Sequence, residues 1–125
     1  MDSVWHTGKV IRGLQNGRKF GFPTANMDVE APFNCENGVY AVCLSIDNES
    51  YKGMLYVGTR PTLHLQQQTV EVNIFDFDRD IYDKELQFKI LKQIRKEKFF
   101  SSVEELIARL RTDKNEILTF FEELY

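Results

Sequence analysis

The order of apolar and polar positions divides the chain into a long β-rich part followed by a helical tail. Alternation is clearest where Leu86, Phe88 and Ile90 are expected to point inward. The segment Gly38–Ile46 is apolar at nearly every position, which predicts a strand buried on both faces. Six strands are expected, over residues 8–13, 24–30, 38–46, 51–58, 69–77 and 85–91. Short polar connections join most of them, and a small antiparallel barrel closes such a set without free edges.

The tail, residues 101–125, has the apolar period of helices. Ser102 and Glu105 form a capping box ahead of the stripe in "SSVEELIARLR". Asp113 is a candidate cap for a second helix, whose stripe contains Ile117 and Phe121. The pattern predicts C-terminal α-helices packed on the barrel. No repeat or linker is visible, so residues 1–125 are expected to form a single domain.

Composition and charge narrow the class of protein. The hydrophobic content of 42% and charged content of 28% are ordinary for a globular domain. A net charge of −3 argues against a nucleic-acid-binding protein, which usually needs a basic excess. There is no membrane-length apolar run and no signal-peptide core, and Cys35 and Cys43 lack the spacing of a zinc site. We therefore expect a cytoplasmic protein that binds neither membrane nor nucleic acid.

The stretch "GRKFGFPTAN" is the first candidate for chemistry. Glycines spaced by four allow a backbone to approach an anion closely, and two cations could neutralise phosphate. Thr24 and Asn26 share one face of an extended segment, and their oxygens suit Mg²⁺ that bridges substrate phosphates. The alternative is a glycine-containing turn with solvated cations, because short glycine patterns are weak signals. The residues of the predicted phosphate loop are Gly13, Gly17, Arg18, Lys19, Gly21 and Pro23.

Two further segments could belong to a site. Glu71 lies on the polar face of its predicted strand with Thr69 and Asn73, where a carboxylate could accept a proton from a substrate hydroxyl. The alternative is a solvent-facing strand glutamate. The aromatic pair Phe99–Phe100 of "IRKEKFF" could cover a flat ligand, or could equally be core between barrel and helix.

Taken in order, these segments resemble the riboflavin kinase (flavokinase) family. The resemblance is carried by "GKVIRGLQNGRKFGFPTAN", "NGVYAV", "YKGMLYVGTRPT", "VEVNIFDFDRDIYDKEL" and "IRKEKFFSSVEEL", which together cover nearly the whole chain. Departures from the family pattern are Asp83, where glycine is common after Tyr82, Asn73 in place of histidine, and Arg60 in place of asparagine. None of these departures removes a proposed catalytic group.

The resemblance implies a six-stranded antiparallel Greek-key barrel and ATP-dependent phosphorylation of riboflavin to FMN, with ADP as the second product. It assigns Thr24 and Asn26 to Mg²⁺ and nucleotide, and Glu71 to the general base. It assigns Arg95, Glu97 and Phe99 to the segment bordering the flavin. Such a domain occurs alone or fused to an FMN adenylyltransferase domain. A non-catalytic flavin- or nucleotide-binding barrel is the alternative function.

Overall fold

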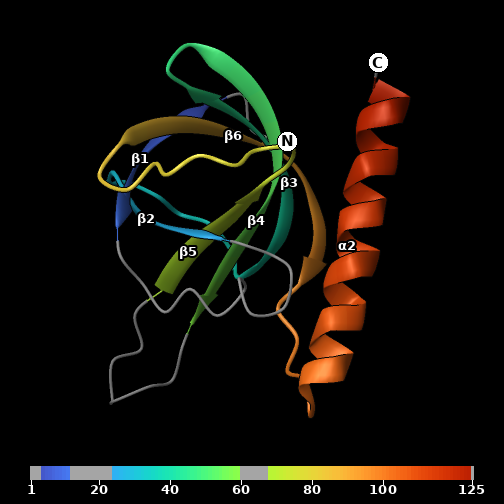
Figure 1. Cartoon of the computed structure of the whole chain (residues 1–125). Coiled ribbons are helices and arrows are strands. Elements are labelled where there is room, and N and C mark those ends of the chain that lie inside the picture. The colour runs from blue at the N-terminus through green and yellow to red at the C-terminus, as the bar shows by residue number, and fades with distance from the viewer. Residues whose placement is uncertain (1–3, 12–23, 60–67, 125) are drawn as a thin grey trace.

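The computed structural model describes residues 4–11, 24–59 and 68–124. These described residues form six strands and one helix (Figure 1). These are β1 (Trp5–Ile11), β2 (Ala25–Val29), β3 (Gly38–Ile46), β4 (Glu49–Thr59), β5 (Gln68–Ile74), β6 (Glu85–Lys96) and α2 (Val103–Leu124). The strands close into an antiparallel barrel in the order β1-β2-β5-β4-β3-β6. The predicted six-stranded antiparallel barrel is confirmed.

The strand order places β2 beside β5, although two strands separate them in the sequence. Strands β3, β4 and β5 follow one another as antiparallel neighbours, and β5 ends up next to the earlier strand β2, which is a Greek-key arrangement. The β3–β4 hairpin turns at Asp47 and Asn48, whose φ angles of 51° and 66° are those of a tight hairpin turn. This topology makes β5 the strand between β2 and β4.

The barrel interior is filled by inward-facing residues of all six strands. Val70, Val72 and Ile74 of β5 belong to this core, as the alternation predicted. The tightest part contains Leu44, Leu55, Leu86 and Phe88, each at most 1% exposed. Burying such side chains stabilises the fold by about 1.5–3 kcal/mol each, so the barrel is a rigid support for polar groups on its outer face.

In the described C-terminal part, residues 101–124, one helix, α2, replaces the two predicted helices. It is continuous from Val103 to Leu124, and Asp113 is a buried residue within it and not a cap. The predicted start is confirmed, because Ser102 Oγ accepts a hydrogen bond from the Glu105 backbone N–H at 3.2 Å. Among the described residues, no helix is long and apolar enough to cross a membrane.

Helix α2 lies along the outside of the barrel, against β3, β4 and β6 (Figure 1). Ile117 and Phe121 are its most buried apolar residues, and they join a second core with Val39 and Ala41 of β3. Strand β3 is therefore buried on both faces, by the barrel interior and by the helix. This explains the nearly continuous apolar sequence of Gly38–Ile46.

Candidate functional site

The candidate site is built on a row of polar side chains that crosses three neighbouring strands. In the register of the sheet, Glu71 of β5 lies directly opposite Asn26 of β2 and Tyr56 of β4. Residues directly opposite in antiparallel strands point to the same face, so these three side chains share the outer face of the barrel. Glu71 is only 7% exposed, and a solvent-facing position is therefore wrong for it.

Thr24 extends the row beyond the start of β2. Its Oγ1 lies 3.5 Å from Oε1 of Glu71, at the long limit of hydrogen bonding. Long contacts of this kind are common in catalytic groups before the substrate is bound. The structure thus brings Glu71 next to Thr24 and Asn26, from which it is more than 40 residues away in the sequence.

Asn26 has an unusual environment. Its amide nitrogen Nδ2 is buried and has no hydrogen-bond partner among the described residues. A buried polar group without a partner is costly, by about 1–3 kcal/mol. A half-turn of the amide exchanges its nitrogen and oxygen, so the same position could present an oxygen acceptor. The residue is placed as expected of a group whose partner is a ligand.

A cavity of about 660 Å³ opens beside Thr24 and Asn26. Its apolar wall includes Val10, Val72 and Ile81, and its polar wall includes residues 78–80 of the β5–β6 connection. We call it pocket 1. Its size and mixed lining are typical of a site for a small molecule or nucleotide.

The β5–β6 connection is fastened beside pocket 1 by charged contacts. Asp47 of the β3–β4 turn pairs with Lys84 at 2.9 Å and with Arg79 at 3.7 Å. The hydrogen bond from Lys84 and the charges of Lys84 and Arg79 lower the pKa of Asp47. Arg79 also stacks over Phe77, 5.1 Å from the ring centre. Asp83 adopts a φ of 70°, a conformation that glycine adopts without strain.

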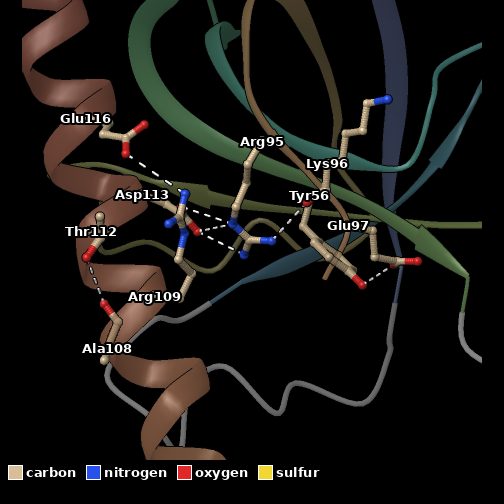
Figure 2. Close-up of polar contacts among 9 residues, drawn as sticks. All are labelled: Tyr56, Arg95, Lys96, Glu97, Ala108, Arg109, Thr112, Asp113 and Glu116. Atoms are coloured by element: carbon tan, nitrogen blue, oxygen red, sulfur yellow. Dashed lines mark hydrogen bonds and ion pairs between the residues drawn. The ribbon is translucent and has the colours of Figure 1, made fainter. Parts of the chain in front are cut away.

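A second, smaller pocket lies at the other end of the polar row. It has a volume of about 400 Å³ and is lined by Tyr56, by residues 98–102 and by Val103 and Leu106 of α2. We call it pocket 2. The Tyr56 hydroxyl donates a 2.6 Å hydrogen bond to Oε2 of Glu97 beside this pocket (Figure 2). Phe99 lines the pocket while 90% exposed, so it is not a core residue.

Arg95, the third residue expected near the flavin, points to the helix (Figure 2). Its Nε donates to both carboxylate oxygens of Asp113, at 3.0 and 2.9 Å, and its Nη2 lies 2.9 Å from Oδ2. Its Nη1 donates to the backbone oxygen of Lys96. Its guanidinium is thus occupied by contacts with α2 and its own strand, whereas Glu97 and Phe99 lie beside pocket 2.

Sequence reasoning missed Tyr56 and Asp113. Tyr56 is one aromatic residue in an apolar hairpin strand, and only the register with Glu71 gives it a place in the row. Asp113 carried a signal, because it follows Leu110 by three residues and precedes Ile117 by four, on the buried stripe of a continuous helix. The remaining predicted residues, Gly13, Gly17, Arg18, Lys19, Gly21 and Pro23, lie outside the described residues.

The donor set fits a magnesium ion. The part of the chain that the structure describes has no group of three or more His, Cys, Asp or Glu side chains placed to hold a metal. Thr24, Asn26 and Glu71 instead offer a hydroxyl, an amide and a single carboxylate. Mg²⁺ prefers few protein oxygens, because it keeps several waters and binds substrate phosphates. These residues therefore suit Mg²⁺ carried by a nucleotide better than a permanent all-protein site.

The site is thus a buried carboxylate, Glu71, in a polar row that has pocket 1 at Asn26 and pocket 2 at Tyr56. The sequence matches the riboflavin kinase family (Flavokinase) over residues 2–121, and the chain belongs to this family. The match covers every described strand and most of α2.

Individual relatives agree with the family. The chain is 38% identical over 116 residues to the RNA-binding riboflavin kinase RibR of Bacillus subtilis, covering 92% of this chain and 50% of the relative. It is 36% identical over 121 residues to the bifunctional riboflavin kinase/FMN adenylyltransferase of the same organism, covering 94% and 38%. The chain thus spans half or less of the length of these relatives.

A solved structure from Streptococcus pneumoniae, described as a macrolide-efflux protein, has a TM-score of 0.82 to this chain at 35% identity. The likeness covers 89% of this chain and 37% of that protein. It supports the barrel fold, and the efflux described for the larger protein is not carried over to this chain.

Proposed function

We propose that this chain is a riboflavin kinase that transfers the γ-phosphate of ATP to the ribityl 5′-hydroxyl of riboflavin, giving FMN and ADP. Family membership supports the substrate class. The observation that carries the proposal is Glu71, a buried carboxylate on β5 between pocket 1 at Asn26 and pocket 2 at Tyr56. A phosphate donor in one pocket and an alcohol in the other would meet beside it.

In this proposal, the residues of the row have separate tasks. Glu71 accepts the proton of the attacking hydroxyl, since it is the carboxylate at the centre of the row. Thr24 and Asn26 hold the nucleotide phosphates and would hold Mg²⁺ on the pocket 1 side. When bound, Mg²⁺ supplies charge neutralisation at the phosphates. Phe99 and the other walls of pocket 2 cover the apolar flavin ring.

The direct test is to incubate the protein with riboflavin, ATP and Mg²⁺ and to separate the flavins by chromatography. We expect FMN and ADP in equal amounts, and no FMN when EDTA removes the metal. Riboflavin binding without any FMN would instead identify the non-catalytic flavin-binding alternative. Absence of riboflavin binding, ATP binding and turnover would reject both functions.

Glu71→Gln tests the proposed base. We expect this variant to fold normally and to lose about 10²–10⁴-fold in kcat, the usual effect of removing a general base. Glu85→Gln is the matched control, because it makes the same change on an exposed strand position of β6. Turnover of Glu71→Gln close to that of the control would refute the base assignment.

We also propose that residues 1–125 act as one kinase unit, whether alone or joined to an FMN adenylyltransferase domain. Fusion is suggested by the bifunctional relative, of which this chain covers 38%. The RNA binding named for RibR belongs to a protein of which this chain covers half. It is not part of the present proposal.

A further inference from the structure

A buried ion cluster joins the end of β6 to the middle of α2 (Figure 2). At its centre is Asp113, whose side chain is 0% exposed. Besides the contacts from Arg95, Asp113 accepts a hydrogen bond from Nε of Arg109 at 2.9 Å. The side chains of Arg95 and Arg109 are 11% and 33% exposed. The carboxylate is therefore held between one guanidinium from the barrel and one from its own helix.

Stability alone does not explain this cluster. Apolar residues of similar volume often replace a buried ion pair with no loss of stability, because burial removes water from both charges. Asp113 lies on the helix stripe that elsewhere packs apolar residues such as Ile117. What the ion pair adds is direction, since a bidentate arginine–carboxylate contact fixes both distance and orientation. It thus fixes the register of α2 against β6.

This register determines the shape of pocket 2. One wall of the pocket comes from residues 98–102, which directly follow β6, and another from Val103 and Leu106 in the first turns of α2. Arg95 is only three residues before the first wall. The strand side is closely packed, because a Cβ added to Gly38 of β3 would meet the backbone oxygen of Arg95 at 2.5 Å. Sliding of the helix is therefore the motion that would alter the pocket.

We propose that Arg95 and Asp113 are positioning residues that hold pocket 2 in its flavin-binding shape. The proposal rests on the proposed function in one respect, that pocket 2 receives the flavin. Arg95 itself does not contact the flavin in this proposal, because its guanidinium binds the carboxylate of Asp113 on α2. Arg95 then acts through the segment that it holds, which includes Glu97 and Phe99.

The main test is the double variant Arg95→Met/Asp113→Leu, which removes both charges of the pair between β6 and α2. Arg109 loses its contact with Asp113 but is one-third exposed and keeps its contact with Glu116 at 3.9 Å. We expect a folded protein whose KM for riboflavin rises at least tenfold, while its KM for ATP and its kcat change less than threefold. The matched control is Lys96→Met/Glu122→Leu, which removes one cation from β6 and one carboxylate from α2 at exposed positions. A folded double variant with the riboflavin KM of this control would overturn the proposal.

A second measurement needs no flavin and is made on Asp113→Asn as well, in case the double variant fails to fold. Hydrogen exchange of residues 97–106 should be at least tenfold faster than in the control. The β1–β2 pair, which lies outside the contacts of α2 with β3, β4 and β6, should be unchanged as an internal reference. Equal exchange of residues 97–106 in variant and control would overturn the proposal. If the wild-type protein makes no FMN, the proposed function fails, and the exchange result still decides whether the ion pair holds this segment.

Discussion

At the scale of single residues, a substitution of Asn26 can distinguish a role in ligand binding from a role in stability. Its buried Nδ2 lacks a partner among the described residues, so removing it should relieve a cost rather than create one. We expect Asn26→Ala to keep its free energy of unfolding within about 1 kcal/mol of wild type. Its KM for ATP should rise at least tenfold. Urea unfolding and initial rates measure the two effects.

Asn37 is the matched control for this prediction. Its Nδ2 donates to Thr59 Oγ1 at 2.9 Å, and its Oδ1 accepts a 2.9 Å hydrogen bond from Gln68. Asn37→Ala should therefore lose stability, by about 0.5–1.5 kcal/mol for each hydrogen bond, with an unchanged KM for ATP. The reverse pattern, with Asn26→Ala unstable and Asn37→Ala impaired for ATP, would contradict the assignment.

Asp47 gives a prediction about pH. Its pKa is lowered in the folded protein by Lys84, with a smaller contribution from Arg79. A lowered folded-state pKa means that the contribution to stability is present at neutral pH and is lost as the pH falls through that pKa. In an NMR titration, Lys84→Met should raise the pKa of the Asp47 carboxyl toward its ordinary value. An unchanged pKa would show that the pair at 2.9 Å does not persist in solution.

At the scale of elements, the close packing at the end of β6 can be tested with two glycines. A Cβ at Gly38 would meet the backbone oxygen of Arg95 at 2.5 Å. A Cβ at Gly58 would meet the side-chain oxygens of Tyr56 and Glu97, both at 2.3 Å. Backbone cannot move aside as these side chains can. We expect Gly38→Ala to destabilise by about 1–3 kcal/mol and Gly58→Ala by less, as measured by urea unfolding.

The same two variants should differ in function. Gly58→Ala displaces the Tyr56–Glu97 hydrogen bond beside pocket 2, so its KM for riboflavin should rise while its stability changes little. Equal losses of stability in the two variants would show that the Tyr56–Glu97 contact is as rigid as the backbone.

The bounds of strands and helix show which parts of the fold the apolar pattern of the sequence could predict. Strand β3 has the predicted bounds, Gly38–Ile46, because a strand buried on both faces leaves a long apolar run. Strand β6 continues to Lys96, five residues past its predicted end at Leu91. The prediction ended too early because two irregularities in the pairing with β3 break the alternation of apolar and polar residues beyond Ile90. The predicted break in the helix at Asp113 is wrong for a related reason. An acidic residue resembles a cap unless its buried partner, Arg95, is known.

The candidate site was predictable only where local pattern sufficed. Thr24 and Asn26 share a face by their spacing, and Glu71 lies on the polar face of an alternating strand. That these residues meet depends on β2 pairing with β5, which is a property of the Greek-key topology. The burial of Glu71 between neighbouring strands and the contact of Arg95 with α2 are likewise set by long-range packing.

At the scale of the whole molecule, the two pockets have separate walls. Pocket 1 is formed by β1, β2, β5 and the β5–β6 connection, whereas pocket 2 is formed by β4, the β6–α2 connection and α2. They are connected by the row of Asn26, Glu71 and Tyr56. Substitutions in one pocket should therefore change the affinity for one substrate only, whereas substitutions in the row should change the rate of phosphoryl transfer.

This separation can be tested with one residue from each wall. Tyr82→Ala in pocket 1 should raise the KM for ATP about tenfold and leave the KM for riboflavin within twofold, and Leu106→Ala in pocket 2 should do the reverse. Because distant sites act independently, the double variant should show both increases at their single-variant sizes. If either single variant raised both constants equally, the substrates would share one pocket. Glu71 would then have no place between them, and the proposed transfer across β5 would be wrong.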